Sequence, residues 1–477
     1  MPFHEADAYD RLPRDKVETM ELKGKKVLVV GLGKSGLAAA LFLRRQGAQV
    51  TVSDIRSAES LAREIPALIE EGISVEAGGH GLLTFRRQDL IVVSPGVPLD
   101  TPELVQARSF GRPVIGELEL AARFLKGKIM AITGSNGKTT TTALAGEILK
   151  EAGLPTLVAG NIGVPVVGLI DESTENTWSV LEVSSFQLES TEKFHPKIAV
   201  ILNITPDHLD RHGNFENYAL AKERIFTAQG AGDFAVLNAD NARTAEAAAR
   251  SHAPVYWFSA RHTVAQGAWV ESGNVVYRSA AGAATETILP IAKIPLKGEH
   301  NVENVLAAVC AARLAGVAAG VIARAVENFR AVEHRLEYVD TINGVEYYND
   351  SKATNVDATE KAVAAFPGGI HLILGGKDKG APYSPLAPLL RERVRAIYTI
   401  GAAAAKIESE LRGVVPIHSC ETLAKAVDAA ATAARPGDVV LLAPACSSYD
   451  QFENYEQRGR VFKQLVCERR DWKTRNA

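Results

Sequence analysis

The segment 132–140, with the sequence Ile-Thr-Gly-Ser-Asn-Gly-Lys-Thr-Thr, constrains the fold of this chain more than any other. It follows the apolar run 128–131 and precedes a segment of helix-forming residues, 141–150. A buried strand that enters a glycine turn and then a helix points several backbone N–H groups and a helix N-terminus at one spot, which suits a polyphosphate. The sequence therefore predicts a phosphate-binding loop between a strand and a helix.

Two residues of this loop suggest how it would bind a nucleotide. Lys138 would reach the outer phosphates, and the hydroxyl of Thr139 would bind Mg²⁺. The full P-loop pattern has a further glycine where Ile132 stands, so only the second half of that pattern is present. The alternative is a glycine turn whose lysine is merely solvated. We favour the nucleotide because strand, turn, Gly-Lys-Thr and helix follow one another in the right order.

Length and composition limit the class of protein. A chain of 477 residues is too long for one hydrophobic core, and the usual domain size predicts about three domains. Hydrophobic residues make up 46% of the chain and charged residues 23%, which is typical of a soluble globular protein. The net charge of −3 offers no basic surface to a polyanion, so we expect no nucleic-acid partner.

Cysteine usage and hydropathy indicate the compartment. The four cysteines are few and widely spaced, which fits a reducing compartment and argues against a disulfide framework or a cysteine-based zinc site. No apolar stretch approaches membrane-spanning length, and the polar segment 1–21 has no signal-peptide core. We therefore predict a cytoplasmic protein without a membrane partner, in which residues 1–20 form a flexible N-terminal extension.

A second glycine turn lies near the N-terminus. The pattern Gly-Leu-Gly-Lys-Ser-Gly at 31–36 follows an expected strand, 25–30, and precedes an expected helix, 37–46. Taken alone, this fingerprint indicates NAD. It is weak evidence, since it specifies only a nucleotide-like anion, and the glycines could instead serve only the packing of helix on sheet.

Two further strands are expected in the same N-terminal sheet. The strand 49–53 ends at Asp54, where dinucleotide-binding folds place the acid that holds a ribose. The strand 89–93 runs into the tight turn Ser94-Pro95-Gly96. Ligands of open parallel sheets bind at this carboxyl edge, so both strand ends are candidate binding positions.

Polar side chains end two strands that follow the phosphate loop. The expected strand 178–182 ends in Glu182, where nucleotide-hydrolysing folds hold Mg²⁺, and the strand 197–204 leads to Asp207 and His208. A lone carboxylate at a strand end is often only a surface group, and a lone histidine is often structural. Acids and a histidine gathered at neighbouring strand ends favour a metal or phosphate role for His208.

Three other polar residues have open interpretations. Lys222 lies in a helical pattern, 218–226, and from the residues alone it is interpreted as a solvated helix lysine. Asn301 and Asn304 share one face near the start of an expected helix, 305–315. Capping would explain one of these asparagines, and a ligand contact could explain the other.

Strands and helices alternate again from Ala331 onward, which predicts another doubly wound sheet. The expected strands are 345–348, 370–374, 396–400 and 438–442. Charged and hydroxyl residues follow several of them, so their carboxyl ends could bind a small zwitterion or a phosphate.

Together these features resemble the Mur ligase family over nearly the whole chain. Four motifs occur in the family's order: Thr-Gly-Ser-Asn-Gly-Lys-Thr at 133–139, Glu-Val-Ser-Ser-Phe-Gln-Leu-Glu at 182–189, Asn-Ile-Thr-Pro-Asp-His-Leu-Asp-Arg-His at 203–212 and Asn-Asp-Ser-Lys-Ala-Thr-Asn at 349–355. Phe-Gln after the paired serines, Ser-Pro-Gly at 94–96 and Pro-Ala-Cys-Ser-Ser-Tyr-Asp-Gln-Phe at 444–452 most resemble the D-glutamate-adding member. By this resemblance the turn at 31–36 binds UDP rather than NAD.

The resemblance implies an α/β protein of three domains, in which two Rossmann-like doubly wound sheets flank a central P-loop ATPase-like domain. We expect a UDP-binding Rossmann-like domain at 21–118, an ATP-binding domain at 119–330 and an amino-acid-binding Rossmann-like domain at 331–477. A monomer is expected.

The implied activity is ATP-dependent addition of D-glutamate to UDP-N-acetylmuramoyl-L-alanine through an acyl phosphate, in peptidoglycan precursor synthesis. The implied cofactors are ATP, two Mg²⁺ ions and a carbamoylated Lys222. A carbamate turns an ammonium into an anionic metal ligand, so the resemblance replaces the solvated interpretation of Lys222.

The resemblance also assigns site residues by motif. The catalytic residues would be Lys138, His208 and Lys222, and the metal ligands Thr139, Glu182, His208 and carbamoylated Lys222. ATP would be bound by Gly134, Ser135, Asn136, Gly137, Lys138, Thr139, Thr140, Asn301, Asn304, Arg335, Asp350 and Lys352. The UDP substrate would be bound by Gly33, Lys34, Ser35, Asp54, Arg56, Ser94, Pro95, Gly96, Asn161, Ser184 and His208, and D-glutamate by Thr354, Lys379, Ser448 and Tyr455.

Two positions depart from the family pattern. Tyr455 stands where a phenylalanine is familiar, and Lys377 stands where some members have an acid. The arrangement of the loop 375–380 is therefore open at this point.

Two other classes of protein share part of this pattern. A folate-type polyglutamate ligase has a similar ATPase core but would lack the N-terminal UDP domain that residues 31–96 predict. A nicotinamide-dependent dehydrogenase with an incidental phosphate loop could be distinguished by titration with NADH.

Overall fold

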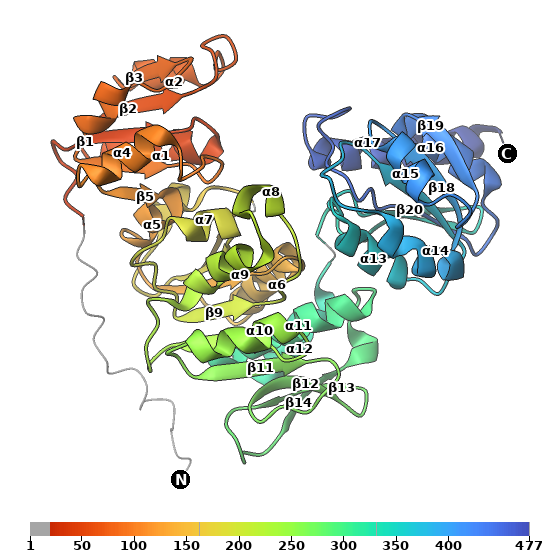
Figure 1. Cartoon of the computed structure of the whole chain (residues 1–477). Helices are drawn as coiled ribbons and strands as arrows, with labels where there is room; N and C mark the ends of the chain where they lie inside the picture. Colours follow the sequence, from red (N-terminus) through yellow and green to blue (C-terminus); the bar gives the residue numbers. More distant parts are fainter. Residues whose placement is uncertain (1–19, 162, 331, 477) are drawn as a thin grey trace. The chain divides into compact units, whose positions relative to one another are not determined.

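The computed structural model describes residues 20–161, 163–330 and 332–476, with the elements labelled in Figure 1. Residues 1–19 of the predicted N-terminal extension lie outside the described residues. The chain divides into two compact units, of which unit 1 holds residues 1–289 and 305–325 and unit 2 holds residues 290–304 and 326–477. In the part of the chain that is described, no helix combines the length and hydropathy needed to cross a membrane.

The first sheet of unit 1 is parallel, with the strand order β3-β2-β1-β4-β5. Its strands are β1 (Lys26–Val30), β2 (Gln49–Asp54), β3 (Ser74–Ala77), β4 (Leu90–Val93) and β5 (Val114–Gly116). Its helices are α1 (Lys34–Arg45), α2 (Ile65–Glu70), α3 (Leu82–Arg86) and α4 (Pro102–Ser109).

Both faces of this sheet are buried. Along β1, Val27 and Val29 join one hydrophobic cluster, whereas Leu28 and Val30 join another. Successive side chains of a strand point to opposite faces, so an unbroken apolar run is what a sheet covered by helices on both faces requires.

The second sheet of unit 1 has the order β14-β13-β12-β11-β10-β9-β6-β8-β7 and is mixed, because β13 pairs antiparallel with β12. Its strands are β6 (Lys128–Thr133), β7 (Thr156–Gly160), β8 (Trp178–Glu182), β9 (Ile198–Ile201), β10 (Phe234–Asn238), β11 (Val255–Ser259), β12 (Gly267–Glu271), β13 (Asn274–Arg278) and β14 (Glu286–Pro290). Its helices are α5 (Glu117–Ala122), α6 (Lys138–Glu151), α7 (Ser185–Glu189), α8 (Leu209–His212), α9 (Phe215–Glu223) and α10 (Ala242–Ala247). The strand β6 lies between β8 and β9, so the polar ends of three parallel strands meet at one edge.

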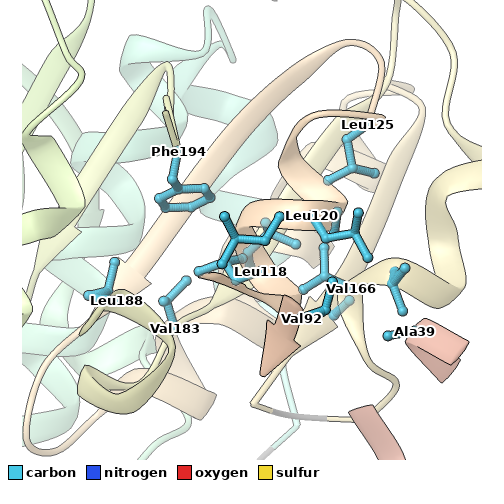
Figure 2. Packing of buried hydrophobic residues seen from close by; sticks show 14 of the residues in the cluster. Ala39, Val92, Leu118, Leu120, Leu125, Val166, Val183, Leu188 and Phe194 are labelled. Carbon is cyan, nitrogen blue, oxygen red and sulfur yellow. The ribbon is translucent and has the colours of Figure 1, made fainter. Parts of the chain in front are cut away.

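Helix α5 joins the two sheets of unit 1 through one hydrophobic cluster. In Figure 2, Leu118 and Leu120 lie at the centre of this cluster, with Ala39 and Val92 of the first sheet's layer among their neighbours. Phe194 belongs to the same cluster on the side of the second sheet. The apolar side chains of α5 therefore connect the cores of the two sheets.

Unit 2 contains a third sheet, with the order β15-β16-β20-β17-β18-β19, in which only the pairing of β15 with β16 is antiparallel. Its strands are β15 (Glu337–Ile342), β16 (Val345–Asn349), β17 (Ile370–Gly375), β18 (Val394–Ile400), β19 (Ile417–Glu421) and β20 (Val439–Leu442). Its helices are α13 (Val356–Ala364), α14 (Ala387–Arg393), α15 (Ala404–Glu410), α16 (Leu423–Ala433) and α17 (Tyr455–Asn476), and two helices shared between the units are α11 (Glu299–Leu314) and α12 (Ala319–Asn328).

This third sheet is also covered on both faces. Leu372 and Leu374 of β17 belong to one hydrophobic cluster, and Ile373 belongs to a second cluster on the opposite face. The three α/β sheets with helical layers confirm the predicted fold class.

Candidate active site

The N-terminal glycine turn needs its glycines for different reasons. Gly31 has a φ of 87°, a left-handed conformation that favours glycine. A Cβ at Gly36 would lie 1.9 Å from the carbonyl oxygen of Gly31, so only glycine lets α1 start this close to β1. Ser94 closes the turn from the end of β4, because its hydroxyl donates to the same Gly31 carbonyl at 2.7 Å.

Asp54 and Arg56 form one pair beside this turn. Asp54 accepts from the backbone N–H of Leu32 at 2.6 Å, and both of its oxygens also accept from Arg56. Burial acts to raise the pKa of Asp54, but the hydrogen bonds from Arg56 and Leu32 hold it below its usual value. Asp54 thus fixes the shape of the turn, a structural task in addition to the predicted ribose contact.

The remaining predicted UDP-site residues of this sheet lie on the same edge. Gly33 is the N-cap of α1, Lys34 and Ser35 open that helix, and Pro95 and Gly96 follow Ser94 after β4. Lys34 is exposed to solvent.

The phosphate loop between β6 and α6 is held by residues outside it. Asn203, at the end of β9, receives the N–H of Asn136 at 2.8 Å through its side-chain oxygen and the N–H of Ser135 through its backbone carbonyl. The Ser135 hydroxyl lies 3.0 Å from the hydroxyl of Tyr218 on α9. Gly137, the N-cap of α6, has a φ of 86°, which again favours glycine.

Two lysines converge on one carbonyl of this loop. Lys138 Nζ donates to the carbonyl oxygens of Gly134 and Ser135, each at 2.8 Å. Lys222 Nζ, which comes from α9, also donates to the Gly134 carbonyl at 2.8 Å. The structure therefore brings Lys222 to the phosphate loop, and the solvated interpretation made from its helical pattern is wrong.

The surroundings of Lys222 disfavour its protonated form. Its side chain is 2% exposed, which disfavours the charged form, whereas the Tyr218 ring, whose centre lies 4.6 Å from Nζ, favours it. Burial and the neighbouring Lys138 lower its pKa well below the usual lysine value, although Asp207 and Glu182 act in the opposite direction. Burial therefore favours the neutral amine at this position more than water would.

Glu182 and Thr139 form a buried oxygen pair next to the lysines. The Thr139 hydroxyl donates to Glu182 Oε2 at 2.7 Å, and the amide of Asn161 donates to Glu182 Oε1 at 3.0 Å. Glu182 is fully buried and Thr139 is 1% exposed. Thr140 follows in the first turn of α6 and is also buried.

His208 and Ser184 stand at the start of two short helices. His208 precedes α8 with a φ of 52°, and its ring packs edge-on against Phe186 at 4.9 Å between centroids. Its Nε2 lies 3.7 Å from an oxygen of Asp207. Ser184 caps α7, since its hydroxyl accepts the N–H of Gln187, whose side chain in turn accepts the N–H of Ser184.

In unit 2, Asp350 and Arg335 are neighbours. Burial raises the pKa of Asp350 to about 7, although the positive charge of Arg335 acts to lower it. The Lys352 ammonium lies 5.0 Å from the centre of the Tyr455 ring, a cation–π contact. Tyr455 is thus a positioning partner for Lys352, and this contact needs only the aromatic ring.

Three of the predicted D-glutamate residues, Thr354, Lys379 and Ser448, lie on loops that follow neighbouring strands, whereas Tyr455 opens α17. Lys379 Nζ donates to the Thr354 hydroxyl at 3.4 Å, which links the loops after β17 and β16. Ser448 is 2% exposed and belongs to the loop after β20. Lys377, the position that departs from the family pattern, exchanges backbone hydrogen bonds with Ser447 and leaves its side chain exposed.

Asn301 and Asn304 lie in the first turns of α11, which begins at Glu299, earlier than the predicted residue 305. The Asn301 amide donates to the carbonyl of Lys297 at 2.7 Å, and the Asn304 amide donates to Asn301 Oδ1 at 3.0 Å. Both are buried, and their amide groups order the start of the helix.

The structure therefore gathers the predicted residues into separate groups. In unit 1, the residues Lys138, Thr139, Glu182 and Lys222 meet around the phosphate loop, while Arg335, Asp350, Lys352, Thr354, Lys379, Ser448 and Tyr455 belong to unit 2. Sequence reasoning missed Asn203 and Tyr218 as supports of the phosphate loop. Asn203 opens a motif quoted above, so its place in that motif was the available signal.

Three descriptions of protein-family domains match this chain. The description "Mur ligase MurD-like, N-terminal domain" matches residues 25–116, "Mur ligase middle domain" matches residues 132–312, and "Mur ligase, glutamate ligase domain" matches residues 334–446.

The chain is also similar to curated proteins named UDP-N-acetylmuramoylalanine--D-glutamate ligase. The relative from Acidobacterium capsulatum is 70% identical over 451 residues, which cover 94% of this chain and 98% of that protein. The relative from Koribacter versatilis is 60% identical over 447 residues, again 94% of this chain and 98% of that protein.

Solved structures share the fold at lower identity. A pseudomurein peptide ligase type C from Methanothermus fervidus has a TM-score of 0.59 at 21% identity and covers 93% of this chain and 100% of its own. The UDP-N-acetylmuramate-alanine ligase from Thermotoga maritima has a TM-score of 0.58 at 22% identity and covers 93% of this chain and 99% of its own.

Proposed function

This chain belongs to the Mur ligase family, and on that premise we propose that it joins D-glutamate to UDP-N-acetylmuramoyl-L-alanine at the expense of ATP. The observation that carries the proposal is the 70% identity, over 94% of the chain, to a protein named for this reaction. The reaction is a step in the synthesis of peptidoglycan precursors.

The reaction has two chemical steps. The γ-phosphoryl group of ATP is transferred to the carboxylate of the UDP substrate, which gives an acyl phosphate and ADP. The neutral amine of D-glutamate then attacks the acyl carbon, the bond from carbon to phosphate oxygen breaks, and the amine nitrogen loses its proton. Such steps require fixed positive charge around the phosphoryl group and rigid placement of the reactants.

We assign the phosphate contacts to the loop between β6 and α6. In the structure Lys138 donates to the carbonyls of Gly134 and Ser135, so its ammonium is held over the loop at the start of α6. In the reaction it would exchange these acceptors for phosphate oxygens, while the N–H groups of the loop and the helix N-terminus bind the remaining oxygens.

The residues next to this loop fit Mg²⁺. A buried carboxylate and a buried hydroxyl, those of Glu182 and Thr139, lie 2.7 Å apart, and both are oxygen ligands of the kind that Mg²⁺ prefers. We propose that Thr139 and Glu182 hold one ion, and that His208 and carbamoylated Lys222 hold a second. When bound, the ions would neutralise the negative charge that develops on the phosphoryl oxygens.

Carbamoylation of Lys222 is supported by its environment. The amine must be neutral to attack CO₂, and burial beside Lys138 favours the neutral form. The reaction forms a bond between Nζ and carbon, releases a proton and leaves an anion close to the Lys138 ammonium. The role of this anion would be to bind metal in the second site.

The other two substrates are assigned to the remaining groups of residues. We propose that the edge formed by Gly33, Asp54, Arg56 and Ser94 binds UDP, and that Asn161, Ser184 and His208 contact the muramoyl part. In unit 2, we assign Thr354, Lys379, Ser448 and Tyr455 to D-glutamate and Asn301, Asn304, Arg335, Asp350 and Lys352 to the nucleotide and the reacting groups.

We also propose that the protein works in the cytoplasm. The four cysteines are free thiols, which is compatible with a reducing compartment. The expected monomer stays a prediction that sedimentation analysis would check.

The test is the release of phosphate from ATP with UDP-N-acetylmuramoyl-L-alanine and a panel of amino acids. We expect release only when all three reactants are present, with D-glutamate far better than L-glutamate, because fixed charge and hydroxyl partners reject a misplaced carboxylate. Equal turnover with L-glutamate or meso-diaminopimelate would contradict the proposal.

A further inference from the structure

A buried arginine lies beneath the loops to which D-glutamate is assigned. Arg458, in the first turn of α17, is 0% exposed, which is rare for an arginine. Burial lowers its pKa to about 10, far above neutral pH, so the side chain stays a cation inside the protein.

The guanidinium group of Arg458 connects two of these loops. Its Nε donates to the Ser351 hydroxyl at 2.9 Å and its Nη2 to the Ser351 carbonyl at 2.8 Å, in the loop after β16. Its Nη1 and Nη2 donate to the Cys446 carbonyl at 3.2 Å, and Nη1 also reaches the Ser447 carbonyl at 3.4 Å, in the loop after β20. These bonds use the planar fork of donors that only arginine offers.

The loop after β17 is bound to the loop after β20 through backbone contacts. Ser447 exchanges hydrogen bonds with Lys377 in the loop after β17, and a Cβ at Gly376 would lie 2.3 Å from the Ser447 carbonyl. Ala445 donates to the carbonyl of Ala353 at 2.9 Å, which links the loops after β20 and β16 directly. Arg458 therefore binds the carbonyl groups around which all three loops meet.

The residues held in this way adjoin the proposed site. Ser351 precedes Lys352, and Ser447 precedes Ser448, so a shift of either carbonyl moves a residue assigned to a substrate. The strands β16, β20 and β17 are neighbours in the sheet, which means that the three loops leave one edge side by side.

We propose that Arg458 is a positioning residue for ligation, which fixes Lys352 and Ser448 relative to each other and so determines how D-glutamate is held. This inference rests on the proposed function, because it takes these loops as the amino-acid site. Arg458 touches no substrate in this account and acts only through the carbonyls and the hydroxyl that it binds.

The test compares Arg458→Met and Arg458→Lys with Arg460→Met, a control on an exposed position of the same helix. We expect the KM for D-glutamate to rise roughly tenfold or more in Arg458→Met, while the KM for the UDP substrate, whose proposed residues lie in unit 1, changes less than about twofold. Arg458→Lys should resemble Arg458→Met, because a lysine keeps the charge but cannot bind both loops. Arg460→Met should match the wild type.

A purely structural role would give a different result. It would lower the fraction of active enzyme, seen as a lower kcat with all KM values unchanged, and that result would overturn the proposal, as would an unchanged KM for D-glutamate. If Arg458→Met does not fold, as judged by circular dichroism, Ser351→Ala tests the same network, since it removes the hydroxyl that accepts from Arg458 and donates to the Tyr455 carbonyl at 2.9 Å. A severalfold rise in the KM for D-glutamate supports the proposal, and an unchanged KM contradicts it.

Wild-type enzyme that releases no phosphate with D-glutamate would refute the proposed function, an outcome separate from failure of this inference.

Discussion

Lys222 shows how the meaning of one residue depends on its tertiary surroundings. A lysine on a helix is usually solvated, and its neighbours in the chain gave no other indication. The structure buries it to 2% exposure and directs its Nζ at the Gly134 carbonyl beside Lys138. The Lys138 ammonium would repel a protonated Lys222, so this arrangement favours a neutral or anionic group at the end of the Lys222 side chain.

The first prediction at this scale follows from that change of charge. Lys222→Ala should lower activity by roughly 100-fold or more, because a metal ligand is lost. Short carboxylates such as acetate should restore part of it by occupying the vacated position. Lys222→Arg should stay inactive and should not respond to acetate, because a guanidinium keeps the positive charge and forms no carbamate. The measurement is phosphate release with all three reactants, and near-normal activity of the Arg variant would contradict the assignment.

Glu117 carries a second residue-scale prediction, on stability and pH. It is 1% exposed, its Oε1 accepts the N–H of Val167 at 2.8 Å, and its Oε2 is buried without a hydrogen-bond partner. Burial raises its pKa to about 7, although the backbone N–H groups of Val167 and Val166 act to lower it. The folded state therefore holds a proton that the unfolded state releases, and stability falls as pH rises from about 4.5 to about 7.

Glu117→Gln should remove this dependence, because an amide is neutral at every pH. We expect variant and wild type to have similar thermal midpoints near pH 4.5, and the variant to be the more stable one at pH 8, by at most about 3 kcal/mol. Thermal unfolding at the two pH values is the measurement. An advantage of the same size at both would mean that Glu117 does not titrate as argued.

At the scale of elements, the packing of α1 on β1 depends on Gly36. A Cβ there would meet the Gly31 carbonyl at 1.9 Å, so Gly36→Ala must displace the turn that we assign to UDP. We expect the affinity for the UDP substrate, measured by calorimetry, to fall by roughly tenfold or more. Gly320→Ala is the matched control, since a Cβ in α12 would have no neighbour within 4 Å and alanine favours a helix. Equal affinity in both variants would mean that the turn does not hold the nucleotide.

The elements also show what the sequence could and could not predict. The central strands were predicted to within three residues, for example 178–182 for β8, because apolar runs that end in glycine or polar residues are distinctive. The edge strand β15 and the long helix α17 were missed, since charged residues interrupt the apolar residues of β15 and α17 is largely polar. In the candidate site the motif residues were found, but Tyr218 and Arg458 were not, because their tasks depend on groups distant in the chain.

At the scale of the whole molecule, the tasks proposed for unit 1 are divided between two sheets. The residues assigned to UDP around Gly33 and Asp54 follow strands of the first sheet, and the phosphate loop follows β6 of the second. The two sheets share a hydrophobic cluster through α5, so they are coupled in stability although their polar edges carry separate groups.

The last prediction tests this division with Lys138→Ala. The substitution removes the ammonium held over the phosphate loop but leaves the hydrogen bonds around Gly31, Asp54 and Ser94 unchanged, because these lie on the other sheet. ATP turnover should fall below detection, whereas calorimetry should find the affinity for the UDP substrate within about twofold of the wild type, as expected for separate sites. Gly36→Ala is the converse variant, which should lose affinity for the UDP substrate and keep affinity for ATP. If Lys138→Ala lost the UDP substrate together with ATP, the two nucleotide sites would not be separate, and the assignment of the N-terminal glycine turn to UDP would have to be abandoned.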